Sequence, residues 1–189
     1  MTRHALFSAA MDACDPDIAD HAARVSSHAR AIATRLGWDE VRLAELELGS
    51  RLHDVGKLAV RPEVLAKPGR LDPGELAAVR VHPVEGVWLI AGVPSLAPAL
   101  PYVLFHHERW DGCGYPTGRA GVEIPVEGRV MAVADSFDAM TTTRPYRRAV
   151  GLDEAVAEVR RCAGTQFDPE IADAFLDAIE CGDVVLAAA

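Results

Sequence analysis

Residues 41–56 read VRLAELELGSRLHDVG, a stretch in which apolar side chains recur at steps of three and four residues. This spacing places them on one side of an α-helix, where they form a stripe that can face a hydrophobic core. The stripe consists of Val41, Ala44, Leu48, Leu52 and Val55. We therefore predict a helix that carries His53 and Asp54 near its end and stops at Gly56.

Most of the remaining sequence also predicts helices. The pairs Asp15–Pro16 and Asp72–Pro73 are typical of a helix cap and first turn, and they open helices that reach about Leu36 and Ala91. A short helical piece carries FHHER at 105–109. Further helices are predicted over residues 126–140, 153–162 and 169–179. No strand pair is indicated, so we expect an all-α bundle of about seven helices.

One long irregular segment interrupts these helices. Residues 111–125 read DGCGYPTGRAGVEIP, and their density of glycine and proline predicts a loop. A loop of about fifteen residues in a compact domain is usually functional or mobile. No low-complexity stretch separates two halves of the chain, so we expect a single domain over residues 1–189.

Composition and charge exclude several classes of function. Charges or prolines break every apolar stretch before the roughly eighteen residues that a membrane span needs, and residues 1–17 resemble no secretory signal. We therefore expect a cytoplasmic protein without membrane contact. The formal net charge of -9 argues against binding of long nucleic acid. Bound cations would still allow a small phosphate substrate.

Histidines and aspartates are paired in a pattern that indicates a metal site. Asp17 and His21 are four residues apart, so on a helix they project from one face and could share one cation. His53 and Asp54 are adjacent, and a cation between them, or one bridged to a second metal, could use both.

Two further elements extend this pattern. His106 and His107 repeat the adjacency, which would suit two neighbouring metals that each take one ring, and Asp135 in VADSFDAM completes a mixed nitrogen and oxygen set. Such ligands suit iron, manganese, zinc or nickel better than magnesium. Two metals would clamp the attacking and leaving oxygens of an in-line phosphoryl displacement.

Each feature by itself also has an ordinary structural explanation. A single histidine such as His4 or His28 is more often a surface or satisfied core residue than a ligand, and HD and HH dipeptides occur by chance. The presence of Asp17, Asp54 and Asp135 together with five histidines favours metal binding. These five are His21, His53, His82, His106 and His107.

Six segments together resemble the successive signatures of the HD-GYP domain, a branch of the HD phosphohydrolase superfamily. They are HAARV at 21–25, LHDVGKLAV at 52–60, VHPVEG at 81–86, HHERWDGCGYP at 106–116, ADSFDAMTTTRPYR at 134–147 and GTQFDP at 164–169. The resemblance covers nearly the whole chain. It implies an all-helical fold, a binuclear or trinuclear metal centre, and hydrolysis of cyclic di-GMP to linear pGpG or to GMP.

The resemblance also implies which residues bind metal. The implied ligands are His21, His53, Asp54, His82, His106, His107 and Asp135. Family members expected to hold a third metal carry a glutamate four residues before the first histidine, whereas this chain has the shorter Asp17. We therefore expect two or three divalent transition metals, with iron or manganese favoured over nickel or zinc.

The implied mechanism is attack of a metal-bridging hydroxide on a phosphorus atom of the cyclic dinucleotide, with Asp54 as the bridging carboxylate. Lys57 lies one turn beyond His53, where its ammonium could reach a phosphate oxygen or, alternatively, satisfy carbonyls at a helix end. Guanidinium groups bind phosphate or stack on guanine, and the resemblance implies substrate contacts at Arg144 and Arg147.

The loop residues Gly112, Gly114, Tyr115 and Pro116 have two open roles. The resemblance implies that they could bind diguanylate cyclase domains, and a large amphipathic tyrosine suits an interface. Alternatively, they form a structural cover over the metal site.

Three functions compete. The cyclic di-GMP phosphodiesterase is supported by the complete ligand set. A related HD hydrolase could act on another cyclic dinucleotide or on a nucleotide, but the GYP and RPYR segments favour cyclic di-GMP. A noncatalytic module would bind cyclic di-GMP or a cyclase domain, yet such a module is expected to have lost ligands that this chain retains.

Overall fold

A computed structural model describes residues 18–143 and 148–184, and the regular elements within these ranges are all helical. The α-helices are α2 (Ile18–Arg35), α3 (Glu40–Leu52), α4 (Pro62–Leu65), α5 (Pro73–Arg80), α6 (His82–Ile90), α7 (Leu100–Phe105), α8 (Val126–Thr141), α9 (Leu152–Cys162) and α10 (Pro169–Glu180). Short 3₁₀ helices span Val55–Ala59, Pro94–Ala99 and Gly121–Glu123. The expected all-α class is confirmed. None of the helices in the described ranges is long and apolar enough to cross a membrane.

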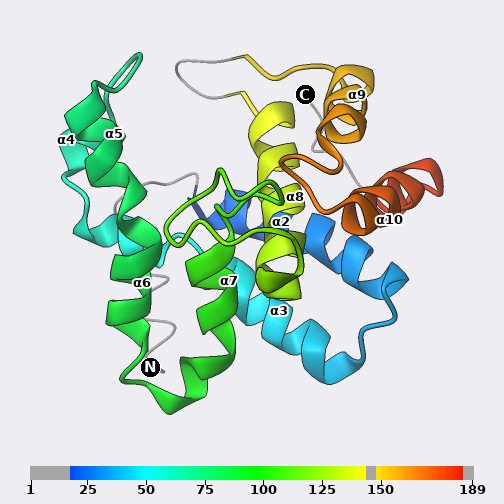
Figure 1. Cartoon of the computed structure of the whole chain (residues 1–189), viewed down its shortest axis with the longest axis horizontal. Helices are drawn as coiled ribbons and strands as arrows, with labels where there is room; N and C mark the ends of the chain where they lie inside the picture. Colours follow the sequence, from blue (N-terminus) through cyan, green and yellow to red (C-terminus); the bar gives the residue numbers. More distant parts are fainter. Residues whose placement is uncertain (1–17, 144–147, 185–189) are drawn as a thin grey trace.

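The hydrophobic core consists of two clusters, and α3 contributes to both. The larger cluster joins α2, α3, α8, α9 and α10 and includes Ile32, Leu46, Phe137 and Phe175. The smaller cluster joins α3, α6 and α7. It consists of Leu52, Val55, Ile90, Leu96, Ala99 and Val103. Figure 1 shows α4 and α5 at one edge of the molecule and α9 and α10 at the other, with α7 and α8 between them.

The helix predicted to run from residue 73 to 91 is divided into α5 and α6. Pro83 explains the break, because it has no amide hydrogen and its ring clashes with the preceding turn of a continuous helix. In such a helix the amide of residue 83 would bond to the Val79 carbonyl. That carbonyl instead lies 2.8 Å from Nδ1 of His82. The break therefore also helps to orient the His82 ring.

Helix α3 ends at Leu52 rather than at the predicted Gly56, so His53 and Asp54 lie in the turn that follows it. The reason is the packing of Gly56 on the start of α6. A Cβ atom on Gly56 would lie 1.8 Å from the carbonyl oxygen of His82 and 2.5 Å from the amide nitrogen of Gly86. The chain leaves the helical path here to make this backbone contact.

Candidate metal centre

The predicted ligands that the structure describes converge from five separate segments. Asp17, Arg144 and Arg147 lie outside the described residues. Five of the converging side chains are buried, while His107 and Asp135 are partly exposed. The segments are α2 with His21, the turn after α3 with His53 and Asp54, the first residue of α6 with His82, the turn after α7 with His106 and His107, and α8 with Asp135.

The side chains form two groups that share Asp54. One group is His21, His53 and Asp54, the other is Asp54, His82, His106 and His107, and within each group the potential ligand atoms lie within 4.8 Å of one another. Asp54 Oδ2 lies 3.4 Å from Nε2 of His53 and 3.9 Å from Nε2 of His21. Asp54 Oδ1 lies 3.3 Å from Nε2 of His82 and 3.9 Å from Nε2 of His106. Each carboxylate oxygen faces one group, which suits a bridge between two cations.

The adjacent histidines of the HHER segment do not divide between the two groups. Their adjacency would suit two neighbouring metals that each take one ring, and the structure places both histidines in the group of His82. Their ring centroids are only 4.1 Å apart, because the turn after α7 points both rings toward α6. The other group is instead approached by Asp135, whose Oδ1 lies 3.4 Å from Nε2 of His21.

Three histidine rings are held in the same way by backbone carbonyls. In each, Nδ1 lies 2.8–2.9 Å from the carbonyl oxygen three residues earlier. Because a carbonyl oxygen only accepts, Nδ1 carries the hydrogen and Nε2 of the neutral ring is left as a potential ligand. These pairs are His53 with Ser50, His82 with Val79 and His106 with Val103.

The donor atoms fit bound cations. Nε2 of His82 and Nε2 of His106 lie 3.1 Å apart. Since both rings donate through Nδ1, both Nε2 atoms present lone pairs, and a cation between them would replace their repulsion with attraction. Nε2 of His53 is buried and has no hydrogen-bond partner among the described residues. A buried nitrogen of this kind is costly unless a ligand satisfies it.

The electrostatics keep His106 and His107 neutral and Asp54 charged. Burial and the neighbouring histidines hold the pKa of His106 well below its usual range, and burial together with His82 lowers the pKa of His107 to about 3. Burial by itself would raise the pKa of Asp54, but Lys57 and His53 bring it well below its ordinary value. The Lys57 ammonium lies 2.6 Å from Asp54 Oδ2. Neutral imidazoles beside an ionised carboxylate are the protonation states that metal binding requires.

Two further residues, which are not among the predicted ligands, hold His21. Asp138, which is buried, places Oδ2 2.7 Å from Nδ1 of His21, and Arg24 donates to Asp138 Oδ1. Burial would raise the pKa of Asp138, but His21 and Arg24 lower it to about 2. The signal in the sequence is a carboxylate three residues after Asp135 on a largely apolar helix, because a buried carboxylate needs a partner.

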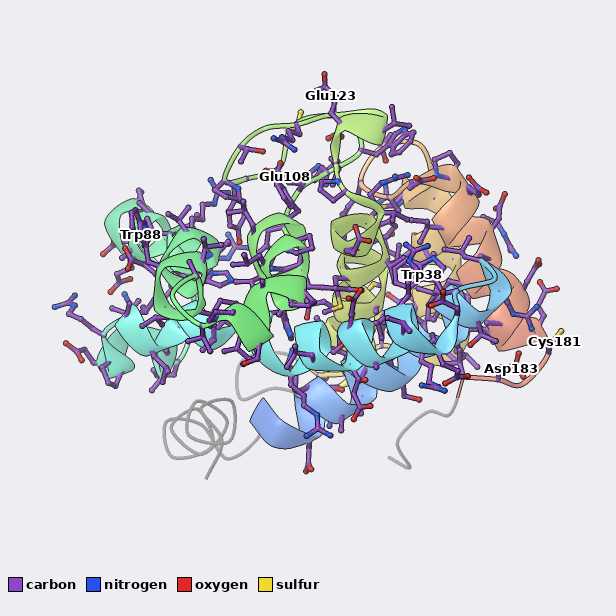
Figure 2. The ribbon with its side chains drawn as sticks, turned by 90° about the horizontal axis from the view of Figure 1, so that it is seen from below. Trp38, Trp88, Glu108, Glu123, Cys181 and Asp183 are labelled. Atoms are coloured by element: carbon purple, nitrogen blue, oxygen red, sulfur yellow. The ribbon has the colours of Figure 1, made fainter. Side chains whose placement is uncertain are left out.

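The loop after α7 covers His107. The Tyr115 ring stacks on the His107 ring at a centroid distance of 4.8 Å, and the Tyr115 amide donates to the His107 carbonyl. Glu108, which is 3% exposed, accepts hydrogen bonds from the Thr117 amide, the Thr117 hydroxyl and the Gly118 amide. Figure 2 shows Glu108 beneath this loop. Of the two roles considered for the loop, a structural cover over the metal site or a binding site for cyclase domains, these contacts favour the cover.

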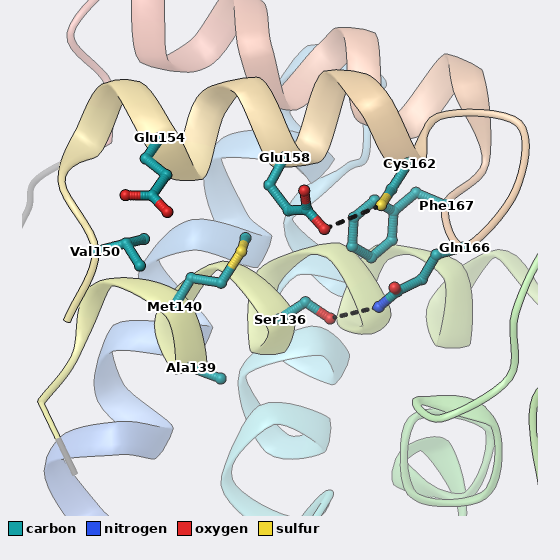
Figure 3. Close-up of a pocket in the computed structure, with 9 residues that line it drawn as sticks. All are labelled: Ser136, Ala139, Met140, Val150, Glu154, Glu158, Cys162, Gln166 and Phe167. Atoms are coloured by element: carbon teal, nitrogen blue, oxygen red, sulfur yellow. Dashed lines mark hydrogen bonds between the residues drawn. The ribbon is translucent and has the colours of Figure 1, made fainter. Parts of the chain in front are cut away.

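A separate hollow of about 340 Å³ lies between α8 and α9 (Figure 3). Met140, Glu158 and Phe167 are among the residues that line it, and its described lining contains no histidine and none of the predicted ligands. The candidate metal centre is therefore the pair of buried histidine groups and not this hollow.

The sequence is similar to those of known proteins. A family model described as HD domain matches residues 6–171. A cyclic di-GMP phosphodiesterase of Thermotoga maritima is 40% identical over 158 residues, which cover 82% of this chain and 43% of that protein. The cyclic di-GMP phosphodiesterase response regulator RpfG of Xanthomonas campestris is 41% identical over 155 residues, covering 81% of this chain and 41% of that protein. The chain thus spans less than half the length of these relatives.

A solved structure supports the same fold. Bd1817, an HDG"Y"P protein from Bdellovibrio bacteriovorus, aligns with a TM-score of 0.70 at 22% sequence identity. The alignment covers 86% of this chain and 52% of that chain. The helical arrangement is therefore shared even where the sequences have diverged.

Proposed function

This chain belongs to the HD domain family, and we propose that it is a metal-dependent phosphodiesterase that hydrolyses cyclic di-GMP to linear pGpG or to GMP. The observation that carries the proposal is the position of Asp54, whose two oxygens face two separate histidine groups. The relatives named as cyclic di-GMP phosphodiesterases support the choice of substrate.

In this proposal His21, His53, Asp54 and Asp135 would hold one ion, and the group that shares Asp54 with His82 would hold the other. Two divalent ions would supply the positive charge that activates water and stabilises an in-line displacement at phosphorus. The mixture of imidazole and carboxylate ligands favours iron or manganese, with nickel or zinc as alternatives. A third ion would depend on Asp17.

Lys57 and two arginines would bind the substrate. The Lys57 side chain is 30% exposed while its ammonium contacts Asp54, so it can reach from the buried carboxylate toward a phosphate oxygen. This contact favours a role for Lys57 in binding the substrate over a role in satisfying carbonyls at a helix end. Arg144 and Arg147 would bind the second phosphate or stack on guanine.

Diguanylate cyclase domains would bind the outer side of the loop that contains Gly112, Gly114, Tyr115 and Pro116. The inner side is occupied, because Tyr115 stacks on His107. The same loop carries Val122, which is 79% exposed. A partner at this loop would therefore sit over the candidate metal centre without replacing its cover.

The test is a hydrolysis assay on protein reconstituted with Mn²⁺ or Fe²⁺, with cyclic di-GMP, cyclic di-AMP, cyclic GMP-AMP and GMP compared as substrates. We expect cyclic di-GMP to be turned over fastest. Asp54→Asn should lower kcat at least about 100-fold and reduce the metal content, because it removes the charge shared by both groups. Asp173→Asn, an exposed aspartate on α10, is the matched control and should be unchanged.

Two results would contradict the proposal. Turnover of GMP without turnover of cyclic di-GMP would indicate a different HD hydrolase. Binding of cyclic di-GMP without hydrolysis, by a protein that recruits less than one metal ion per chain, would indicate a noncatalytic signalling module.

A further inference from the structure

His21 is held differently from His53, His82 and His106. His53 and His106 directly follow a helix, where the last carbonyls have no partner within the helix, and His82 uses a carbonyl freed by Pro83. His21 instead lies inside α2, where the carbonyls bond to amides one turn later. Its Nδ1 must therefore find a side-chain acceptor, and the acceptor is Asp138.

Both carboxylate oxygens of Asp138 contact neighbouring side chains. Its side chain is 1% exposed. Oδ2 lies 2.7 Å from Nδ1 of His21 and 3.3 Å from Nη2 of Arg24, while Oδ1 accepts from Nε of Arg24 at 2.5 Å and from the Thr142 hydroxyl at 3.3 Å. With both oxygens occupied in this way, Asp138 is not placed to be a metal ligand itself.

Helix α8 contacts both nitrogens of the His21 ring. Asp138 holds Nδ1, and Asp135, one turn earlier, places Oδ1 3.4 Å from Nε2. In the neutral ring, a carboxylate that accepts the Nδ1 hydrogen leaves the lone pair on Nε2 and makes this atom a stronger donor to a metal than a carbonyl would. Arg24 fixes the carboxylate in place through two hydrogen bonds.

We propose that Asp138, held by Arg24, is a positioning residue that orients and polarises His21, and so sets the affinity of the His21–His53–Asp54 group for its ion. The inference rests on the proposed function, because it assumes that this group binds a metal. The group of His82, His106 and His107 has backbone anchors for two of its rings and does not depend on Asp138.

The test is a titration of metal-free protein with Mn²⁺, followed by calorimetry and by analysis of bound metal. We expect Asp138→Asn to bind one ion as the unsubstituted protein does and the other about 10–100-fold more weakly, which is the usual effect of losing an outer partner of a metal-bound histidine. Raising the Mn²⁺ concentration should restore its hydrolysis rate. Arg24→Gln should lower the affinity for the same ion by a smaller factor, and Asp173→Asn should lower the affinity for neither ion.

Two outcomes would overturn this role. Unchanged affinity for both ions would show that Asp138 does not act on His21, and an equal loss at both would show a general structural effect. A measurement without any substitution guards against a variant that does not fold. In ¹⁵N NMR spectra of the metal-free protein, recorded at a pH where the His21 ring is neutral, its hydrogen should lie on Nδ1, and a neutral ring with its hydrogen on Nε2 would contradict the proposal.

These outcomes are distinct from a failure of the proposed function. A chain that binds two Mn²⁺ ions but does not hydrolyse cyclic di-GMP would reject the phosphodiesterase and leave the role of Asp138 intact. A chain that hydrolyses cyclic di-GMP while Asp138→Asn matches it in metal affinity would reject only the role of Asp138.

Discussion

The position of Asp54 depends on a neighbouring residue that has no side chain. Gly56 follows Asp54 by two residues and lies directly against the backbone of His82 and Gly86 in α6. This close approach brings Asp54 Oδ1 to within 3.3 Å of Nε2 of His82. A side chain at position 56 would separate the two segments that supply the candidate centre.

Gly56→Ala should therefore lower the free energy of unfolding of the metal-free protein by at least about 2 kcal/mol, because the added Cβ would collide with backbone atoms that cannot move alone. Urea unfolding measures this change, and Mn²⁺ titration should show weaker binding. Gly92→Ala is the matched control, since a Cβ there meets nothing within 4 Å. Equal stability of the two variants would contradict the packing argument.

The loop between α7 and α8 is attached to the body of the molecule at several points. Glu108 binds Thr117 and Gly118 from below, and the Trp110 and Asp111 amides donate to carbonyls of the segment before α10. Gly114 lies so close to Glu108 and Arg109 that a Cβ would come within 2.4–2.7 Å of their backbone atoms. The cover over His107 is thus built from specific contacts.

Glu108→Ala should make the loop more mobile at Thr117 and Gly118, because these residues would lose three hydrogen bonds to one carboxylate oxygen. Hydrogen exchange should show faster exchange of the Thr117 and Gly118 amides, by about tenfold or more if the lost bonds are worth 1.5–3 kcal/mol together. Glu123→Ala is the control on the same loop, where Figure 2 shows the side chain at the outer edge. Unchanged exchange in Glu108→Ala would contradict the anchoring role.

The larger core cluster encloses a histidine that belongs to neither metal group. His28 is 2% exposed and packs against Phe137 of α8 and Phe175 of α10 at centroid distances of 5.3 Å and 6.1 Å. Burial lowers its pKa to about 4, in spite of the opposing charge of Asp138. His28 is therefore a core residue, but not the fully satisfied one that we expected, because its Nδ1 has no hydrogen-bond partner among the described residues.

This burial predicts a component of acid sensitivity for the whole molecule. The unfolded chain binds a proton at His28 near pH 6.5, whereas the folded protein does so only near pH 4, so folding stability falls as the pH decreases through this window. Between pH 7 and pH 5 the free energy of unfolding of the metal-free protein should fall by about 2 kcal/mol more than that of His28→Leu, because leucine cannot titrate. Urea unfolding at several pH values measures the difference, and parallel pH profiles would refute it.

The sequence alone determined the features that depend on local pattern. Apolar residues at helical spacing indicated the all-α class, and α8, α9 and α10 begin and end within one or two residues of the predicted limits. The motif order indicated the family and the histidines and aspartates that the structure brings together. Glycine and proline density indicated the loop between α7 and α8.

Only the tertiary structure decided how these parts meet. The end of α3 at Leu52 depends on contact with α6. The grouping of His106 with His107 depends on how α7 faces α6. The hydrogen bond between His21 and Asp138 joins residues that are 117 positions apart. Spacing along the chain reports which side chains share a face of one helix. It does not report which face of another helix lies opposite, because that is settled by the packing of side chains distant in sequence.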